Sequence, residues 1–451
     1  AINEVHFSLG KKTFLFDQFD LRFNRPDIVL QRMGYADSAL LEAYKKAWEK
    51  RVQKMGFDPS LFVGHDVKFN TPDVVINKSL PASTNESSVI IDFTASDKLY
   101  PIDRLHIYQN GTPVFGSKGK IVKLQNKKNG ELFEVSLMET VTLISGKNVI
   151  ELSATNEQGI ESLRERFEIN YQSPTSEKHD LYIVAIGVSE FIDNSMNLTY
   201  AAKDANDLVS LFESEKEKYA AIHIFKFTNQ QATRVNVLKV KNDLLKSKID
   251  DEVILFVASH GLLDNQLDYY VAMHDMVFEN PASKGLKYEE LEGLLDSIPA
   301  LKKLMLIDAC HSGEVDKEES EIVAVDTQNT YNGVSSRGFK ALKNKSGIGL
   351  KTSFELMMEL FTDLRRGNGA MVISSASGKE FSYESSKWKN GVFSYAVLES
   401  LSTEKADIDN NHEISVSELR DYVFVRVKEL TNGQQNPTSR KENLEFDFRV
   451  W

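Results

Sequence analysis

A cysteine and a histidine in this sequence have the types and positions that covalent catalysis needs. Cys310, the only cysteine, directly follows the largely apolar segment 304–309, and His260, fifty residues earlier, follows the largely apolar segment 253–259. An imidazole beside a thiol raises the fraction of reactive thiolate and can later protonate a leaving group. The pair therefore predicts nucleophilic chemistry on a carbonyl carbon.

Both segments have the length and composition of buried parallel strands, and each ends in turn residues. Open α/β sheets place their chemistry at the carboxyl ends of such strands, so neighbouring strands would bring His260 to Cys310. His311 is an alternative base, but adjacent side chains on an emerging strand point apart, which favours a structural role for it. A lone cysteine is more often a core thiol. Two matching strand ends favour catalysis here.

The chain around this pair alternates strands and helices, which is typical of a parallel sheet covered by helices. The expected strands are Leu181–Gly187, His223–Phe227, Val253–Ala258 and Lys303–Asp308, and the expected helices are Tyr200–Tyr219, Arg234–Lys248 and Tyr288–Ile298. A polar insert follows at 314–351; loops of this length are usually functional or disordered. Order resumes with a capping box at Thr352, a strand at Met371–Ser375, and helices from Phe393 and Ser415.

The first 172 residues have a different character. Residues 1–72 read as a connector or docking segment with a helix at Ser38–Met55, and residues 73–172 contain short alternating strands. Asn110-Gly111 and Asn129-Gly130 between strands are hairpin signals, so we expect a small β-sandwich of immunoglobulin type. The segment 173–177 is the expected linker.

Composition limits the partners and the location. The 451 residues carry a net charge of −12 without a long basic run, which argues against nucleic acid or an anionic membrane as a partner. No apolar stretch approaches a membrane span, and a single cysteine suits a reducing, cytoplasmic location. The chain starts at Ala1 rather than Met, so we expect an upstream part.

The motifs Ser259-His260-Gly261 and Asp308-Ala309-Cys310-His311-Ser312-Gly313, at this spacing, resemble the caspase-like peptidases that include metacaspases, family C14. The resemblance implies a caspase-haemoglobinase fold over 180–451, with a large-subunit part (180–313), the insert, and a small-subunit part (352–451). It implies that the backbone N–H groups of Gly261 and Cys310 form the oxyanion hole, and that no cofactor is required.

The same resemblance implies a substrate class. Metacaspases carry Asp where classical caspases carry Gln two residues before the nucleophile, and this chain has Asp308 there. Asp204 matches a second acid of the S1 pocket, and Ser374 and Ser375 would lie beside the cleft. Two carboxylates would bind a guanidinium and repel an acidic side chain, so the expected substrate is a polypeptide with basic P1. The alternatives have no role in substrate binding: Asp204 would be a solvated surface residue, and Asp308 would be only a polar residue at the end of a strand.

The insert carries basic residues that a basic-specific peptidase could cut, because exposed loops are where proteolysis concentrates. The candidate autocleavage residues are Arg337, Lys340, Lys343, Lys345 and Lys351. The segment Asn24-Arg25-Pro26-Asp27 resembles the region after β-propeller repeats in some bacterial caspase-like proteins, which implies an upstream sensor domain or activating partner.

The segment 407–418 fits a calcium-binding EF-hand loop in which Asp407, Asp409, Asn411 and Glu418 supply oxygen ligands. His412 stands where such loops need Gly, which makes the sharp turn costly. The alternative needs no metal: Ser415 caps the last helix and Glu418 closes its capping box.

Two rival functions remain open. One is a catalytically silent caspase-like scaffold, for which the expected sign is a damaged dyad; this sequence keeps both residues. The other is a related cysteine peptidase with a different P1 preference. Only substrate profiling distinguishes it from a peptidase that cleaves after basic residues.

Overall fold

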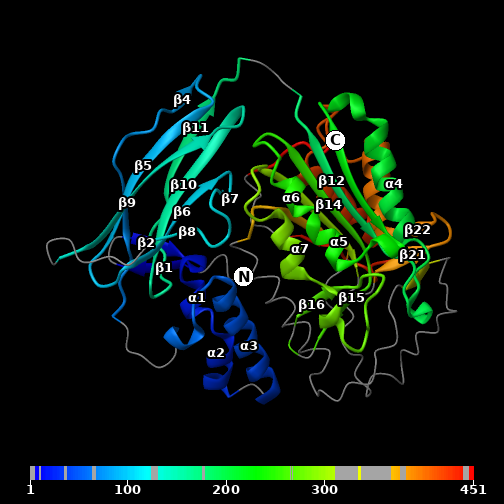
Figure 1. Ribbon diagram of the computed structural model, residues 1–451, viewed down its shortest axis with the longest axis horizontal. Helices are drawn as coiled ribbons and strands as arrows, with labels where there is room; N and C mark the ends of the chain where they lie inside the picture. The colour runs from blue at the N-terminus through cyan, green and yellow to red at the C-terminus, as the bar shows by residue number, and fades with distance from the viewer. Residues whose placement is uncertain are drawn as a thin grey trace. The chain divides into compact units, whose positions relative to one another are not determined.

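The computed structural model describes residues 6–9, 12–34, 38–62, 68–122, 131–174, 178–264, 266, 268–309, 334–336, 367–375, 382–439 and 446–451. The chain forms two compact units. The first comprises the residues before Lys178, and the second comprises nearly all the rest (Figure 1).

A six-stranded sheet forms the centre of the second unit. Its strands, in spatial order, are β13 (Ile222–Thr228), β12 (Leu181–Gly187), β14 (Glu252–Ser259), β18 (Lys302–Ala309), β20 (Met371–Ser374) and β23 (Thr438–Ser439). All neighbouring pairs are parallel except β20 with β23. The alternating pattern of the sequence thus folds into the expected α/β sheet, because the four central strands β12, β14, β18 and β20 are apolar enough to be buried on both faces.

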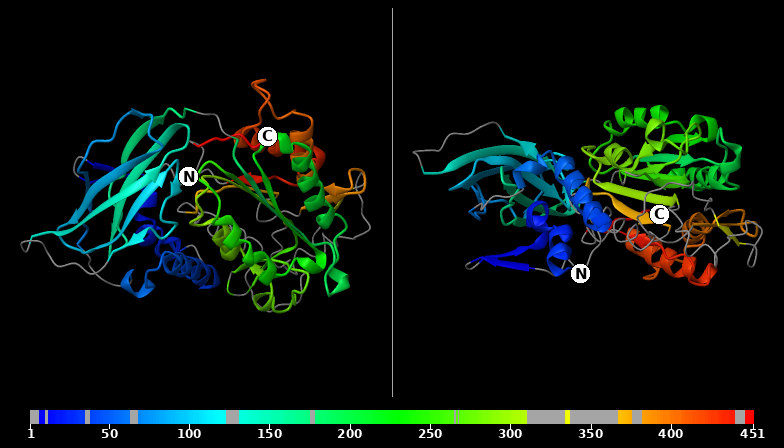
Figure 2. Two further views of the ribbon diagram at one scale, coloured as in Figure 1. Left: turned by 45° about the horizontal axis from the view of Figure 1, so that its top comes forward. Right: turned by 90° about the horizontal axis from the view of Figure 1, so that it is seen from below.

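Helices cover both faces of this sheet (Figure 2). On one face lie α5 (Arg234–Lys239), α6 (Lys241–Leu244) and α7 (Tyr288–Leu295), and on the other lie α4 (Ala201–Ser214), α9 (Val392–Ser402) and α10 (Val416–Leu430). The helix expected at 234–248 is divided in two at Val240, and the helix expected at 200–219 ends at Ser214. Among the described helices, none is long and apolar enough to cross a membrane.

Helix α9 is tied to α10 by a partly buried ion pair. Glu399 accepts hydrogen bonds from Arg426 Nε at 2.6 Å and from the Tyr422 hydroxyl at 2.8 Å. Burial opposes the charge on Glu399, but these hydrogen bonds outweigh it and hold the pKa of Glu399 at about 2. The carboxylate therefore stays ionised at neutral pH and fixes α9 against α10.

Two small sheets lie at the ends of these strands and loops. One contains β15 (Gly261–Leu263), β16 (Tyr269–Val271) and β17 (Leu286–Lys287). The other, in spatial order, contains β19 (Val334–Ser336), β21 (Tyr383–Ser385) and β22 (Asn390–Gly391), and all its pairs are antiparallel. The second sheet joins a strand of the insert to the small-subunit part.

The first unit contains the expected β-sandwich. One sheet consists of β4 (Ser83–Thr84), β11 (Glu165–Tyr171), β10 (Gly146–Asn156), β6 (Ile102–Gln109), β7 (Thr112–Pro113) and β8 (Lys120–Ile121), and the other of β3 (Asp73–Ile76), β5 (Ser88–Asp97) and β9 (Phe133–Thr142). Apolar side chains from both sheets share one core. Asn110 and Gly111 connect β6 to β7 with φ of 50° and 74°, which confirms the hairpin predicted from Asn-Gly.

The segment before the sandwich packs on it. It contains β1 (His6–Leu9), β2 (Lys12–Leu15), α1 (Asp20–Phe23), α2 (Pro26–Met33) and α3 (Ser38–Lys54). The buried Arg104 guanidinium of β6 donates to the Met55 carbonyl at the end of α3 and stacks 4.1 Å from the centre of the Phe57 ring. Pro26 begins α2, and Arg25 both pairs with Asp27 and stacks on Trp48. This motif therefore has a local structural role.

A buried lysine in β18 gives a prediction about stability. Lys303 of β18 is fully buried, and its Nζ donates to the Leu295 carbonyl at 3.2 Å, at the carboxyl end of α7. Lys241 donates to the Gly293 and Leu294 carbonyls at the same helix end. Burial lowers the pKa of Lys303 to about 7, and the nearby Lys241 adds to that effect.

Because the unfolded chain keeps this proton up to the ordinary lysine pKa, the unfolded state binds more protons than the folded state above pH 7. The free energy of unfolding should therefore rise with pH between about 7 and 10, by up to roughly 1 kcal/mol per pH unit from this group. Urea unfolding of the wild type and Lys303→Met across this range measures the slope. The variant should lose it, whereas Lys246→Met, at an exposed lysine, should keep it. An equal slope in all three proteins would contradict this assignment.

Candidate active site

His260 lies directly after β14 and is fixed from three sides. Its side chain is almost completely buried, and its ring packs against Phe191 and Phe278, with centroids 5.3 and 6.0 Å away. Its Nε2 lies 2.8 Å from the Met196 carbonyl oxygen, and its own carbonyl accepts from Ala272 N. The imidazole therefore has one defined orientation.

The contact with Met196 determines the tautomer. A backbone carbonyl can only accept a hydrogen bond, so Nε2 must carry the hydrogen. In the neutral ring, Nδ1 is then the nitrogen with the lone pair that can accept a proton. No sequence pattern pointed to Met196, because it acts through its backbone.

Cys310 and His311 lie outside the described residues, but the strand that leads to Cys310 is described to its end. Strand β18 pairs in parallel with β14, and its last residue, Ala309, is opposite Ser259. His260 and Cys310 are thus the residues that follow two neighbouring parallel strands in the sequence. The strand arrangement predicted from the sequence is confirmed.

Strand β20 is the other neighbour of β18. Ser374 is its last residue, and Ser375 follows it. Both are buried, and Ser375 N donates to Ile307 O at 2.8 Å. The Ser375 hydroxyl lies 3.4 Å from the Ala309 carbonyl oxygen and 2.5 Å from the Ser382 hydroxyl. Gln435, also buried, donates from Nε2 to the Ser375 carbonyl at 2.8 Å. Ser375 thus contacts the end of β18, and Ser382 and Gln435 in turn contact Ser375.

Gly261, the predicted second donor of the oxyanion hole, is the first residue of β15 and pairs with Val271. It is buried and directly follows His260. Its role in an oxyanion hole stays a prediction, because its proposed partner donor is Cys310.

Asp308 is fully buried on β18, opposite Ala258 of β14. One of its carboxylate oxygens accepts from the Ser394 hydroxyl at 2.6 Å and from Ser394 N at 3.3 Å. Ser394 lies in the first turn of α9, where the helix dipole favours a negative charge. Asp308 is therefore not simply a polar residue at the end of a strand. It is a buried carboxylate that is hydrogen-bonded to Ser394.

Asp204 is also fully buried, on α4. It accepts from Asn390 Nδ2 at 2.9 Å and from Gly391 N at 3.1 Å, and Gly391 is the cap of α9. The alternative of a solvated surface role is wrong, because Asp204 is fully buried; the neighbouring Lys203 pairs with Asp207. Asp204 and Asp308 therefore contact the same first turn of one helix, from two different elements.

A third buried acid, Glu384, was not predicted from the sequence. Glu384 of β21 is buried and accepts from Thr199 N at 3.2 Å and from Tyr200 N at 3.4 Å, just before α4. It joins the small-subunit part to the segment that carries Asp204. The candidate autocleavage residues Arg337, Lys340, Lys343, Lys345 and Lys351 lie outside the described residues.

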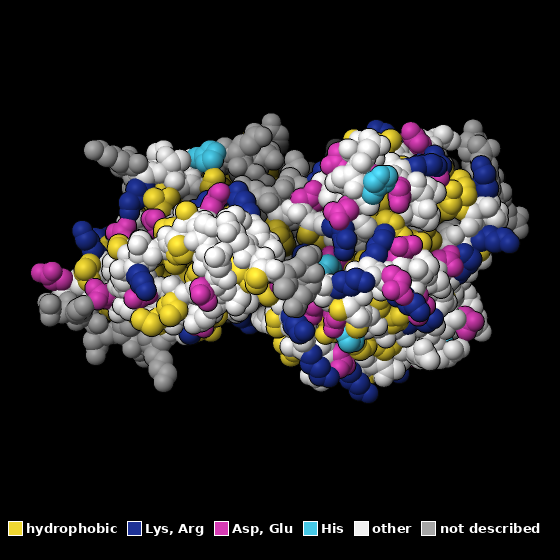
Figure 3. All heavy atoms as spheres, turned by 90° about the horizontal axis from the view of Figure 1, so that it is seen from above, with side chains coloured by type: hydrophobic (Ala, Val, Ile, Leu, Met, Phe, Trp, Pro, Cys, Tyr) yellow, Lys and Arg dark blue, Asp and Glu magenta, His cyan; other side chains and the backbone are white. Residues whose placement is uncertain are grey.

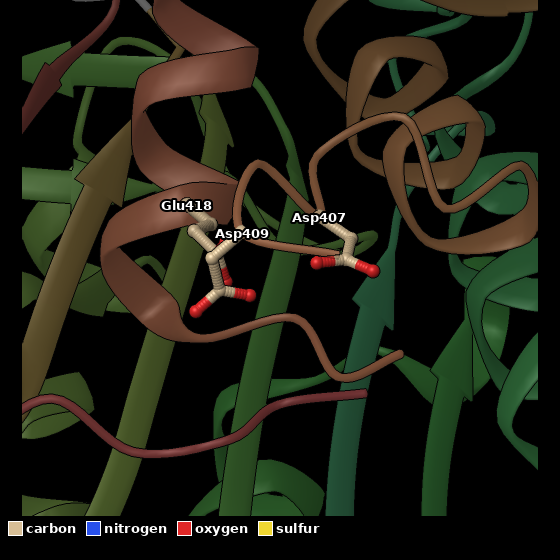
Figure 4. A group of neighbouring side chains, drawn as sticks. All are labelled: Asp407, Asp409 and Glu418. Atoms are coloured by element: carbon tan, nitrogen blue, oxygen red, sulfur yellow. The ribbon is translucent and has the colours of Figure 1, made fainter. Parts of the chain in front are cut away.

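The predicted calcium loop brings its acidic side chains together (Figure 4). Ligand oxygens of Asp407, Asp409 and Glu418 lie within 4.8 Å of one another. Asp407 accepts from Asn411 N and His412 N, and His412 has a φ of 65°, the strained value expected where EF-hand loops need glycine. Ser415 and Glu418 form the predicted capping box of α10. These contacts satisfy the carboxylates without a metal, so calcium binding stays a prediction.

The caspase domain model of peptidase family C14 matches residues 182–449, which include almost all of the sheet, His260, Asp204 and Asp308. The chain belongs to this family. The match confirms the resemblance carried by the His260 and Cys310 motifs, and this caspase domain begins one residue into β12.

Solved structures give weaker likenesses. A protein of Geobacter sulfurreducens is 16% identical, with 58% of this chain and 92% of that chain covered and a TM-score of 0.38. Caspase-1 from Spodoptera frugiperda is 14% identical, with 60% and 92% covered and a TM-score of 0.33. Fibronectin(III)-like modules of Clostridium thermocellum CbhA are 18% identical, with 25% and 52% covered and a TM-score of 0.16. Among curated proteins, none matches the sequence.

Proposed function

We propose that this chain is a cysteine endopeptidase that cleaves polypeptides after arginine or lysine. The family supports a cysteine peptidase in general. The observation that carries the finer proposal is the pair of buried carboxylates, Asp204 and Asp308, at the first turn of α9. Two buried carboxylates, one on β18 and one on α4, favour a cationic side chain and disfavour an acidic one.

The reaction follows from the dyad. His260 takes the Cys310 proton on Nδ1, and the thiolate attacks the carbonyl carbon of the P1 residue. The protonated imidazole then gives its proton to the leaving amine, and water hydrolyses the thioester with His260 again as the base. The Met196 carbonyl stabilises the imidazolium, since it already accepts from Nε2. We expect the N–H groups of Gly261 and Cys310 to bind the oxyanion.

Charge on the face seen in Figure 3 is mixed. Figure 3 shows Lys and Arg side chains intermingled with Asp and Glu on the face in view. This face has no broad patch of a single charge, so we assign the proposed selectivity to the two buried carboxylates. A polypeptide remains the proposed partner, with neither nucleic acid nor a membrane required, and an activating partner could act through the first unit.

A panel of fluorogenic tetrapeptides that differ only at P1 tests the proposal. We expect kcat/KM for P1 Arg and Lys to exceed that for P1 Asp by at least about a thousandfold, because an acidic side chain would meet two buried carboxylates. Efficient cleavage after Asp would favour a related peptidase with a different P1 pocket. No cleavage of any peptide by cut or uncut protein would favour the silent scaffold.

A further inference from the structure

The segment that contacts the proposed base has little regular structure of its own. Residues 188–198 run from the end of β12 toward α4, and within them only Asn194–Met196 forms a helical turn. This segment, which we call the base loop, supplies both the Met196 carbonyl and the Phe191 ring that contact His260. The orientation of the imidazole therefore depends on the contacts that fix the base loop.

Asn229 fixes the beginning of the base loop. It directly follows β13, which is the neighbour of β12 on the side away from β14. Its side-chain oxygen Oδ1 accepts hydrogen bonds from two successive backbone N–H groups, Ser189 N at 2.9 Å and Glu190 N at 3.2 Å. Two backbone donors beyond the end of β12 are thus satisfied by one side chain.

The backbone conformation of Asn229 makes a second demand on this position. Its φ is 46°, in the left-handed region that asparagine, aspartate and glycine adopt more readily than other residues. Its carbonyl accepts from Ala232 N at 2.8 Å, which closes the turn after β13. Asparagine and aspartate meet both demands, whereas glycine meets only the demand on φ because it has no side-chain acceptor.

His274 fixes the middle of the base loop. Its Nδ1 lies 2.6 Å from the Glu190 carbonyl oxygen, and its own carbonyl accepts from Ile192 N at 3.0 Å. Because a carbonyl only accepts, Nδ1 of His274 carries a hydrogen. The backbone N–H of His274 donates to the Ala232 carbonyl, which joins this contact to the turn after β13. Phe191 is therefore held by its neighbours on both sides.

Hydrogen bonds within the base loop extend this restraint to Met196. Asn197 Oδ1 accepts from Phe191 N at 2.7 Å, and Leu198 N donates to Ser189 O at 2.9 Å. These bonds join the two ends of the loop. A displacement of its beginning should therefore also displace Met196, which directly precedes Asn197.

We propose that Asn229 and His274 are positioning residues for the base: they anchor the base loop and thereby hold the His260 imidazole in its one defined orientation. The proposal rests on the proposed function, since it takes His260 as the base of that reaction. Both residues act through the Met196 carbonyl and the Phe191 ring. A catalytic group displaced by about 1 Å can lose about a hundredfold in rate, so loss of either anchor should lower kcat.

Nuclear magnetic resonance of protein that contains ¹⁵N-labelled histidine tests the positioning without any need for activity. The Nε2 proton of His260 should exchange slowly in the wild type, because the ring is buried and Nε2 donates to Met196 O; its absence from His260→Gln assigns the signal. Asn229→Gly keeps the φ but loses the acceptor, so it should speed this exchange at least about tenfold. Asn229→Asp keeps both, so its exchange should stay within about twofold of wild type.

Asn432→Gly is the matched control for the change from asparagine to glycine. Asn432 is exposed after α10 and has a similar φ, 52°. The exchange of the His260 proton and kcat should both stay at wild-type values in this variant. A change as large as that in Asn229→Gly would mean that the His260 signal reports general destabilisation, which overturns the use of Asn229 as an anchor.

Steady-state kinetics on a P1 Arg peptide give the functional readout. Asn229→Gly should lower kcat at least about tenfold and leave KM within about twofold, because the base is displaced while the residues proposed to bind P1 are unchanged. Asn229→Asp should restore kcat to within about threefold of wild type, since a carboxylate oxygen accepts the same two hydrogen bonds. A residue that only stabilised the fold would lower the free energy of unfolding without this change in kcat.

His274 provides an independent test that does not depend on the stability of Asn229→Gly. His274→Leu removes the donor to the Glu190 carbonyl and should lower kcat about fivefold or more. His274→Asn should restore much of the loss, because a side-chain amide can donate from nearly the position of Nδ1.

The outcomes distinguish this inference from the proposed function. Unchanged proton exchange and unchanged kcat in Asn229→Gly, or in His274→Leu, overturn the role assigned to that residue while the peptidase activity stands. Equal losses in Asn229→Asp and Asn229→Gly also overturn it, because the acceptor is then not the cause. If the wild type cleaves no peptide, the proposed function fails, and the exchange of the His260 proton alone decides whether the two residues position the ring.

Discussion

Cys310→Ala should abolish peptide hydrolysis, and His260→Ala should lower kcat by at least about a thousandfold, because members of a nucleophile–base pair act as a unit. In the sequence His260 follows β14 and Cys310 follows β18, and these two strands pair in parallel up to Ser259 and Ala309. The Met196 carbonyl leaves Nδ1 of His260 as the basic nitrogen. Initial rates on a P1 Arg peptide, with folding checked by thermal unfolding, measure both effects.

His311→Ala is the matched control, since it removes an imidazole directly beside the nucleophile. Its kcat should stay within a few-fold of wild type if His260 is the base. The rate of Cys310 alkylation by iodoacetamide adds a second readout, which should fall in His260→Ala and not in His311→Ala. A large loss in His311→Ala with activity retained in His260→Ala would exchange the roles of the two histidines.

The pair of strands that leads to His260 and Cys310 was predictable because it depends on local pattern. Apolar runs that end at His260 and before Cys310 have the composition of buried parallel strands, and such strands bring their carboxyl ends together. The hairpin at Asn110-Gly111 was predictable for a similar reason, since its backbone needs two residues that tolerate positive φ.

The supporting residues were not predictable, because their contacts link distant parts of the chain. Ser394 contacts Asp308 and Asn390 contacts Asp204 across more than 80 and 180 residues, respectively. Gln435 reaches Ser375 across 60 residues. The spacing of residues along the chain does not indicate such pairs, because many other polar residues could supply the hydrogen bond that a buried polar group requires. Met196 has no signal at all, because its contribution is a carbonyl that every residue type supplies.

Substitution of Asp308 has the second largest expected effect. Asp308→Asn should lower kcat/KM for P1 Arg peptides by about a hundredfold or more, because it removes a buried negative charge while it keeps the size of the side chain and an oxygen for Ser394. The loss should be much smaller for a peptide with neutral P1 glutamine. Steady-state kinetics on the two peptides give the ratio directly.

Two further variants separate substrate binding from stability. Ser394→Ala removes the hydroxyl that contacts Asp308 but leaves the charge, so it should lower the free energy of unfolding by about 1 kcal/mol and keep the preference for P1 Arg. Asp204→Asn should also weaken the preference, with a larger cost in stability, because Asn390 and Gly391 both donate to that carboxylate. If Asp308→Asn loses stability and activity on both peptides to the same extent, Asp308 only holds the start of α9, and the P1 side chain must be selected elsewhere.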